Sequence, residues 1–275
     1  MLLPSTISTY LFTEKLLKIE VLVFLVVFIS QLSYQFYTLY RDCVQFLGQI
    51  IILIIALVHY TILMQFVHLV LLINHRFRSL NYFLMSETTF NSQSNKLIVP
   101  KLQQMIGVDN PKIFTDKTLS IDMMLYDVLC DIVTSANGVY GFQMLIMTLG
   151  GIAGITMTLN FGIIIYIKEG ISHEFITCVT WSTISMISLF VLSGCCNSTI
   201  NEASYTSVLL QKLLLLQDIH HDTKAEINLF LQQVSIRSVK FTAWDFFTIK
   251  YSILGSMIGA VITYLVIMVQ FQKIV

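Results

Sequence analysis

The polar residues with the clearest spacing lie in the last apolar stretch of the chain, between residues 246 and 271. Five small or polar residues recur there at steps of four, three, four and seven, which places them on one stripe of a helix. They are Ser252, Ser256, Gly259, Thr263 and Gln270. Gly255 and Gly259 also form a G-x-x-x-G pair. Such a stripe favours either close helix packing or the lining of a water-filled path through a membrane, and the spacing leaves both open.

A second group of amides, rings and one imidazole lies in the other apolar stretches. Its members are Gln31, Tyr34, Gln35, Tyr37, Gln45, Gln49, His59, Asn160 and Trp181. Polar groups that converge inside an apolar bundle suit a small polar organic ligand. Tyrosine and tryptophan also anchor helices at the membrane surface, so ligand binding and anchoring both remain open for this group.

No motif for catalysis, metal binding or a cofactor is present. The sequence lacks a phosphate loop, a nucleophile elbow, a zinc-protease pair and a dinucleotide fingerprint. Its five cysteines include no C-x-x-C pair. Sixteen basic and sixteen acidic residues leave no positive surplus with which to bind a phosphate backbone. We therefore expect no enzymatic activity, no catalytic residues, no cofactor, no metal and no nucleic-acid partner.

The composition indicates that most of the protein's surface contacts membrane lipid. Of 275 residues, 56% are apolar and 12% are charged, so a soluble fold could not hide the apolar area. Five stretches are long and apolar enough to cross a bilayer. They span residues 21–40, 43–74, 140–167, 175–196 and 246–271. The sequence predicts an all-α, polytopic transmembrane helix bundle that forms a single domain over residues 1–275.

The charges predict the orientation of this bundle. Residues 75–138 and 197–245 show helical periodicity and, with the N-terminal tail, carry twelve lysines and arginines. The opposite side carries three, which are Arg41, Lys168 and Lys273. Because positive loops stay inside, we expect cytoplasmic juxtamembrane helices, a cytoplasmic N-terminus and an extracellular C-terminus in the plasma membrane.

Three sequence segments resemble insect gustatory receptors. Thr263-Tyr264, five apolar residues and Gln270-Phe271 match the T-Y, five hydrophobic, Q-F signature that closes the last span of that family. HRFRSLN (75–81) resembles the family's basic stretch before its long cytoplasmic loop, and DIVTSANGVYGFQML (131–145) is similar to the segment that enters the next span. The segments occur in the family's order, and the resemblance extends from about Val21 onward.

The resemblance implies a ligand-gated cation channel that responds to a small-molecule tastant. In that family, a homo- or heterotetramer with other gustatory receptor subunits surrounds a pore lined by the last span. Gln270 and Phe271 would then lie at the extracellular gate, with Tyr264 on the same face as Phe271. The cytoplasmic helices, especially residues 223–239, would hold the subunits together.

Two departures from the family narrow these expectations. Five spans are found where gustatory receptors have seven, so we expect the family's first two spans to be absent. Leu265 follows the T-Y pair, where the sugar-receptor branch has glutamate, which argues against a sugar ligand. A membrane transporter and a non-conducting truncated receptor fragment remain as alternatives. A transporter would be favoured by paired halves and acidic residues within the spans, and the sequence shows neither.

Overall fold

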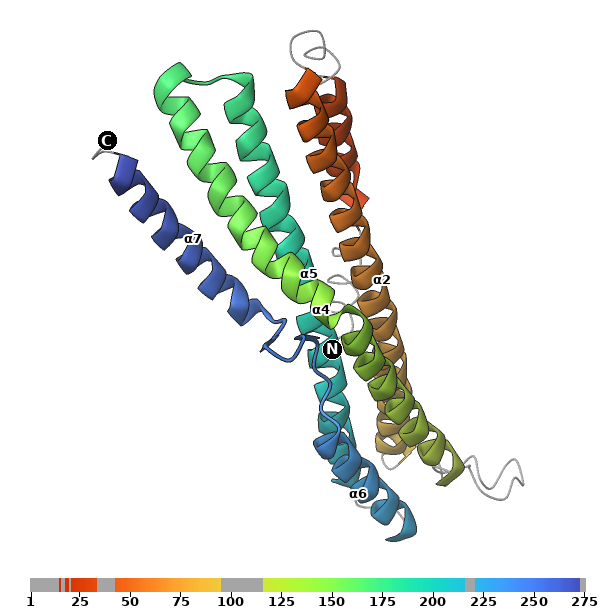
Figure 1. Cartoon of the computed structure of the whole chain (residues 1–275). Coiled ribbons are helices and arrows are strands. Elements are labelled where there is room, and N and C mark those ends of the chain that lie inside the picture. The colour runs from red at the N-terminus through yellow and green to blue at the C-terminus, as the bar shows by residue number, and fades with distance from the viewer. Residues whose placement is uncertain are drawn as a thin grey trace. The chain divides into compact units, whose positions relative to one another are not determined.

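The computed structural model describes residues 15, 18–19, 21–33, 43–94, 116–215 and 221–272, and they form a helical chain (Figure 1). A short apolar helix, Val21–Ser33, comes first. The remaining elements are α2 (Cys43–Ser94), α4 (Asp116–Glu169), α5 (His173–Leu214), α6 (His221–Ile236), β1 (Thr242–Ala243), β2 (Phe247–Thr248) and α7 (Tyr251–Gln272).

Four of these helices are long and apolar enough to cross a membrane. The qualifying ranges are Leu53–Met85, Leu119–Glu169, His173–Leu214 and Tyr251–Phe271. Helices suit a membrane because lipid tails cannot form hydrogen bonds with backbone amide and carbonyl groups. A helix pairs these groups with one another. The prediction of an all-α transmembrane bundle is confirmed, apart from two strands of two residues each. Residues 34–40 of the predicted first span lie outside the described residues.

Several hydroxyl side chains within the long helices bond to their own helix. Thr156 and Thr158 of α4 donate to the carbonyl oxygens of Ile152 and Gly154. Ser188 of α5 donates to the carbonyl oxygen of Ile184 at 2.9 Å. This i−4 bond satisfies a hydroxyl that has no water to bind.

The chain divides into two compact units, and α2, α4 and α5 each contribute to both. The first unit contains residues 1–68, 140–196 and 243–275, and the second contains residues 69–139 and 197–242. Charge and apolar run length place the span borders at 74/75, 138/140, 196/197 and 245/246. The first three borders lie inside α2, α4 and α5, whereas 245/246 falls in the turn between β1 and β2, so the last helix begins at Tyr251 and not at the predicted residue 246. The side of the membrane on which each segment lies stays a prediction.

In the first unit, α4 and α5 form a hairpin against which α7 packs (Figure 1). Gly170 closes the hairpin with a positive φ of 73°, which glycine adopts without steric cost. Ser172 caps α5 by accepting a hydrogen bond from the amide of Phe175 at 3.3 Å. The helices approach closely at Gly162, where an added Cβ would lie 3.3 Å from the Cβ of Cys178.

The second unit has its own core, built around aromatic rings. Tyr126 of α4 contacts Phe77 of α2 and Phe230 of α6 edge to face, with ring centroids 5.7 and 5.8 Å apart. All three side chains are at most 1% exposed. This core joins α2, α4 and α6, helices that are distant in sequence.

Candidate pore helix and ligand site

Among the described residues, the helix α7 packs on one face. Met257 and Val261 are buried and form a cluster with Ile155 of α4 and Leu189 of α5. Leu265 packs against the same cluster one turn further along. Steps of four residues keep Met257, Val261 and Leu265 on one side of the helix, and that side attaches α7 to the hairpin.

The predicted polar stripe lies on the opposite side of α7. Ser252, Ser256, Gly259, Thr263 and Gln270 are all exposed. A Cβ added at Gly255 or Gly259 would meet nothing within 4 Å in the described part of the chain. The G-x-x-x-G pair is therefore free of helix contacts within the described chain, and its surface is open to lipid, to water or to another subunit.

The end of α7 presents its two rings outward. Tyr264 is 58% exposed and Phe271 is 67% exposed, and Gln270 beside it is also exposed. Thr263 is exposed, and its hydroxyl donates to the carbonyl oxygen of Gly259 at 2.8 Å. The hydrogen of that hydroxyl is thus bound within the helix, while its oxygen remains able to accept a bond.

Three rings from three helices meet in the first unit. Phe24 of the helix Val21–Ser33 stacks on Tyr60 of α2, with centroids 3.9 Å apart and an interplanar angle of 4°. Trp181 of α5 meets Phe24 edge to face at 6.0 Å. One turn before Trp181, Thr177 accepts a hydrogen bond from Nε2 of Gln31 at 3.0 Å. The amide therefore bonds one turn from the aromatic ring along α5, and it lies about two turns from Phe24 along the first helix.

This aromatic cluster (Phe24, Tyr60 and Trp181) contains part of the predicted ligand group. Trp181 belongs to it, and Gln31 bonds one turn away. His59, next to Tyr60, and Asn160 of α4 are half-buried. Tyr34, Gln35 and Tyr37 lie outside the described residues, as do the side chains of Gln45 and Gln49.

Sequence reasoning did not single out Phe24, Tyr60 or Thr177. Nothing local distinguishes Phe24 from the other rings of an apolar run, since such a helix is apolar on every side. Thr177 lies four residues before Trp181, and that spacing could have associated the two.

A polar seam in the second unit was also missed. Asn81, 4% exposed, donates to the carbonyl oxygen of Glu202 at 2.8 Å and accepts a bond from the hydroxyl of Thr206 at 2.7 Å. Arg78 lies 3.4 Å from the Glu202 carboxylate. Both Arg78 and Asn81 belong to the HRFRSLN segment. One of its basic residues, Arg78, therefore forms an ion pair that joins α2 to α5.

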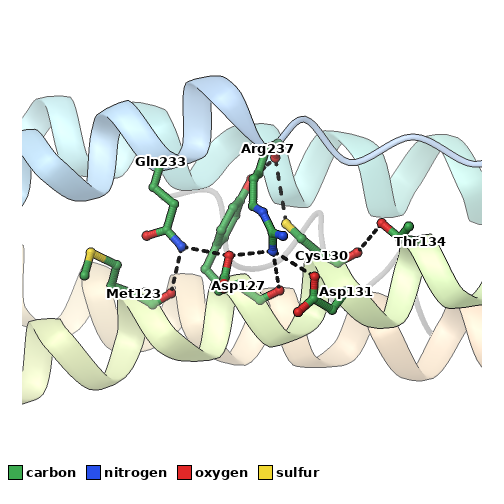
Figure 2. Close-up of polar contacts among 8 residues, drawn as sticks. Met123, Asp127, Cys130, Asp131, Thr134, Gln233 and Arg237 are labelled. Atoms are coloured by element: carbon green, nitrogen blue, oxygen red, sulfur yellow. Dashed lines mark hydrogen bonds and ion pairs between the residues drawn. The ribbon is translucent and has the colours of Figure 1, made fainter.

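A second ionic cluster holds the end of α6 against α4 (Figure 2). Arg237 pairs with the carboxylate of Asp127 and with that of Asp131, the latter at 2.9 Å. Gln233, one turn earlier, donates to Asp127 at 3.0 Å. The hydrogen bond to Asp131 raises the pKa of Arg237. The i, i+4 spacing of the two aspartates is a signal in the sequence that predicts a shared cation.

A tight hairpin connects this cluster to α7. Trp244 and Asp245 have φ angles of 48° and 58°, and the amide of Phe246 bonds to the carbonyl of Ala243 at 3.0 Å. Positive φ at both central residues defines a type I′ turn, which usually contains asparagine or glycine. The ring of Trp244 packs edge to face on Phe142 of α4 at 5.2 Å.

Comparisons with known proteins place this architecture in a family. Residues 9–274 match the 7tm Chemosensory receptor family. A stretch of 97 residues is 34% identical to Gustatory and pheromone receptor 32a of Drosophila melanogaster. This stretch covers 35% of this chain and 20% of that receptor. The backbone is similar to the insect olfactory receptor OR5 from Machilis hrabei in complex with eugenol. That similarity has a TM-score of 0.69 at 14% identity, over 97% of this chain and 68% of the other.

Because the family match covers almost the whole sequence, the chain belongs to the 7tm chemosensory receptor family. The resemblance to insect gustatory receptors is confirmed, and the chain is a multi-pass membrane receptor. The aligned stretch spans a fifth of the length of the curated relative it matches. The structural similarity, at 14% identity, supports the fold.

Proposed function

We propose that the chain is a subunit of a gustatory, ligand-gated cation channel in which α7 lines the pore. The observation that supports this proposal is the division of α7 into two faces. Its apolar face packs on α4 and α5, while Ser252, Ser256 and Thr263 are exposed on the other. Small and hydroxyl-bearing residues suit a water-filled path, and a path between subunits requires an oligomer, here a homo- or heterotetramer with other gustatory receptor subunits.

The proposed orientation places the C-terminal end of α7 outside the cell, so that Gln270 and Phe271 form the extracellular gate. The distribution of lysine and arginine supports it, because twelve lie on the predicted cytoplasmic side. The subunit would then act in the plasma membrane, with the second unit facing the cytoplasm.

The proposed agonist is a small organic tastant that reaches the aromatic cluster. The rings of Phe24, Tyr60 and Trp181 provide an apolar surface, and Gln31 provides an amide one turn away. The olfactory receptor of similar fold was solved with eugenol, a small phenol, and a ligand of this size would suit such a site. Leu265 argues against a sugar.

Cysteine accessibility in the expressed channel tests the pore assignment. With Ser256→Cys, a water-soluble, charged thiol reagent should block the tastant-evoked current, because the side chain would face the aqueous path. Ile262→Cys is the matched control, since Ile262 is 56% exposed on another side of α7 and would face lipid. The unsubstituted chain, whose Cys130, Cys178, Cys195 and Cys196 are buried, gives the background.

Two outcomes would contradict the proposal. Equal modification of the Ser256→Cys and Ile262→Cys variants would show that no face of α7 borders water selectively. A purified chain that remains monomeric, alone and with co-expressed gustatory receptor subunits, would have no axis for a pore and would favour the non-conducting fragment. Mass photometry in lipid nanodiscs distinguishes a monomer from a tetramer.

A further inference from the structure

A cavity of about 340 Å³ lies in the first unit between α4, α5 and α7. Its wall is almost entirely apolar and includes Ile155 and Leu159 of α4, Met186 of α5, and Val261 and Leu265 of α7. The rings of the aromatic cluster do not line it. The cavity lies against the packed face of α7, so it is separate from the polar stripe.

One polar atom in the wall lacks a partner. Ser182 of α5 is 5% exposed and lines the cavity, and its hydroxyl has no hydrogen bond among the described residues. The neighbouring hydroxyl of Thr183 donates to the carbonyl oxygen of Val179 at 2.7 Å. Leaving a buried hydroxyl unbonded costs free energy, so Ser182 favours any occupant that offers it a hydrogen bond.

The chemistry of the wall selects among possible occupants. A water molecule needs two to four polar partners, and the lining offers the hydroxyls of Ser182 and Thr183, of which the second already donates to its own helix. A lipid acyl chain would fill the volume and leave the hydroxyl unbonded. The volume is within the range of small-molecule pockets, and a cavity of less than half this size holds benzene.

We propose that this cavity binds a small, uncharged molecule with a hydrocarbon body and a single hydroxyl or carbonyl group that bonds to Ser182. Such a molecule dissolves in the bilayer and enters from it, because Ile258 and Ile262 on the rim are 43% and 56% exposed. The site is distinct from the proposed tastant site, which lies at the aromatic cluster.

A pair of probes that differ in one hydroxyl tests this proposal. Thymol carries a phenolic hydroxyl, and p-cymene is the same hydrocarbon without it. Binding is measured in phosphatidylcholine nanodiscs holding the full chain, by displacement of tritiated thymol, with empty nanodiscs subtracted and concentrations corrected for partition into lipid. Thymol should bind about three- to tenfold more tightly than p-cymene, which is the contribution of one hydrogen bond.

Substitutions then assign that difference to a residue. Ser182→Ala should remove the preference for thymol and leave p-cymene binding unchanged. Ser188→Ala is the control, because Ser188 is a buried serine of the same helix that does not line the cavity. Leu159→Phe, which fills the cavity, should weaken both probes.

The ligand-free protein gives a second reading. Ser182→Ala should unfold at the same or a higher temperature, since it removes an unbonded hydroxyl. A thymol preference that persists in Ser182→Ala would overturn the proposal, as would the absence of displaceable thymol binding in the unsubstituted chain.

An effect of thymol on current would rest on the proposed function, because Val261 and Leu265 belong to the proposed pore helix. A bound molecule would change how α7 packs and thereby alter the tastant-evoked response. The binding measurement needs no current, so displaceable thymol in a silent protein would count against the channel and leave the site intact.

Discussion

Arg237 joins two carboxylates of α4 to the end of α6, and its backbone is bound as well. Its carbonyl oxygen accepts bonds from the hydroxyl of Tyr126 at 3.3 Å and from the thiol of Cys130 at 3.8 Å. Side chain and backbone therefore attach the same residue to the same helix. The backbone bonds do not depend on the guanidinium, so a substitution of Arg237 isolates the ionic part.

We expect Arg237→Ala to lower the melting temperature of the purified chain, and the loss should shrink at high salt. The arginine and its aspartates are about half exposed, so added ions screen their attraction. Melting curves at about 0.05 and 1 M sodium chloride provide the measurement. Arg76→Ala is the control, because Arg76 is exposed and forms no ion pair among the described residues. A loss of equal size at both salt concentrations would show that Arg237 acts through packing.

The backbone at Asp245 allows a test of strain in the turn before α7. A residue with a side chain in the left-handed region costs about 1–2 kcal/mol relative to glycine. Asp245→Gly should therefore be more stable than Asp245→Ala by about 1 kcal/mol, measured by chemical or thermal unfolding. Both variants remove the carboxylate, so their difference reports the backbone alone.

The exposed α6 position Asn228 provides the reference for this comparison. Because this position lies within a helix, Asn228→Ala should be more stable than Asn228→Gly by about 1 kcal/mol. This order of stability is opposite to the order expected at Asp245. The same order at both positions would contradict the assignment of strain to Asp245.

At the scale of elements, the division of α7 into two faces was partly predictable. The steps between Ser252, Ser256, Gly259 and Thr263 predicted one polar stripe, and the structure shows these residues exposed. The partners of the other face were not predictable. Most positions of α4 and α5 within the first unit are apolar on every side, so the sequence does not mark which residues meet α7.

The same reason explains why the aromatic cluster was incompletely predicted. Trp181 and Gln31 could be predicted as candidates for a ligand site because polar or amphipathic groups are rare in an apolar run. Phe24 stacks on Tyr60 because of how the helices are placed, and no local spacing encodes that. By contrast, the charges at Asp127, Asp131 and Arg237 carry their own signal, since two carboxylates one turn apart repel each other and favour a nearby cation.

Two glycines of α4 should respond in opposite ways to the same substitution. At Gly162 a Cβ would lie 3.3 Å from that of Cys178, so Gly162→Leu should cost about 1–3 kcal/mol by overpacking the hairpin. Gly150 has nothing within 4 Å of an added Cβ among the described residues. Gly150→Leu should be neutral or stabilising by less than about 1 kcal/mol, because leucine forms helices better than glycine.

Thermal unfolding in detergent micelles compares the two variants with the unsubstituted chain. An equal decrease in melting temperature for Gly162→Leu and Gly150→Leu would mean that the close contact at Gly162 does not cause the destabilisation. If Gly162→Leu is as stable as the unsubstituted chain, then α4 and α5 lie further apart at Gly162 than the structure shows.

At the scale of the whole molecule, the helices α2, α4 and α5 continue without a break across the borders between the two units. Charge density predicted where the basic segments begin, because lysine and arginine are costly within lipid. It did not predict that the helices would continue past those points, since polar and apolar helices share the same backbone hydrogen bonds.

Four copies of α7 around a common axis would bring four Phe271 rings together at the proposed gate. A ring of apolar side chains blocks ions by excluding water, so Phe271→Ala should raise the basal current of the expressed channel severalfold. Ile262→Ala is the matched control, because Ile262 is 56% exposed on the side of the same helix opposite Phe271 and away from the polar stripe. Surface labelling must show equal amounts of both variants at the membrane. If Phe271→Ala reaches the surface and leaves both the leak and the tastant response unchanged, the rings do not form the gate.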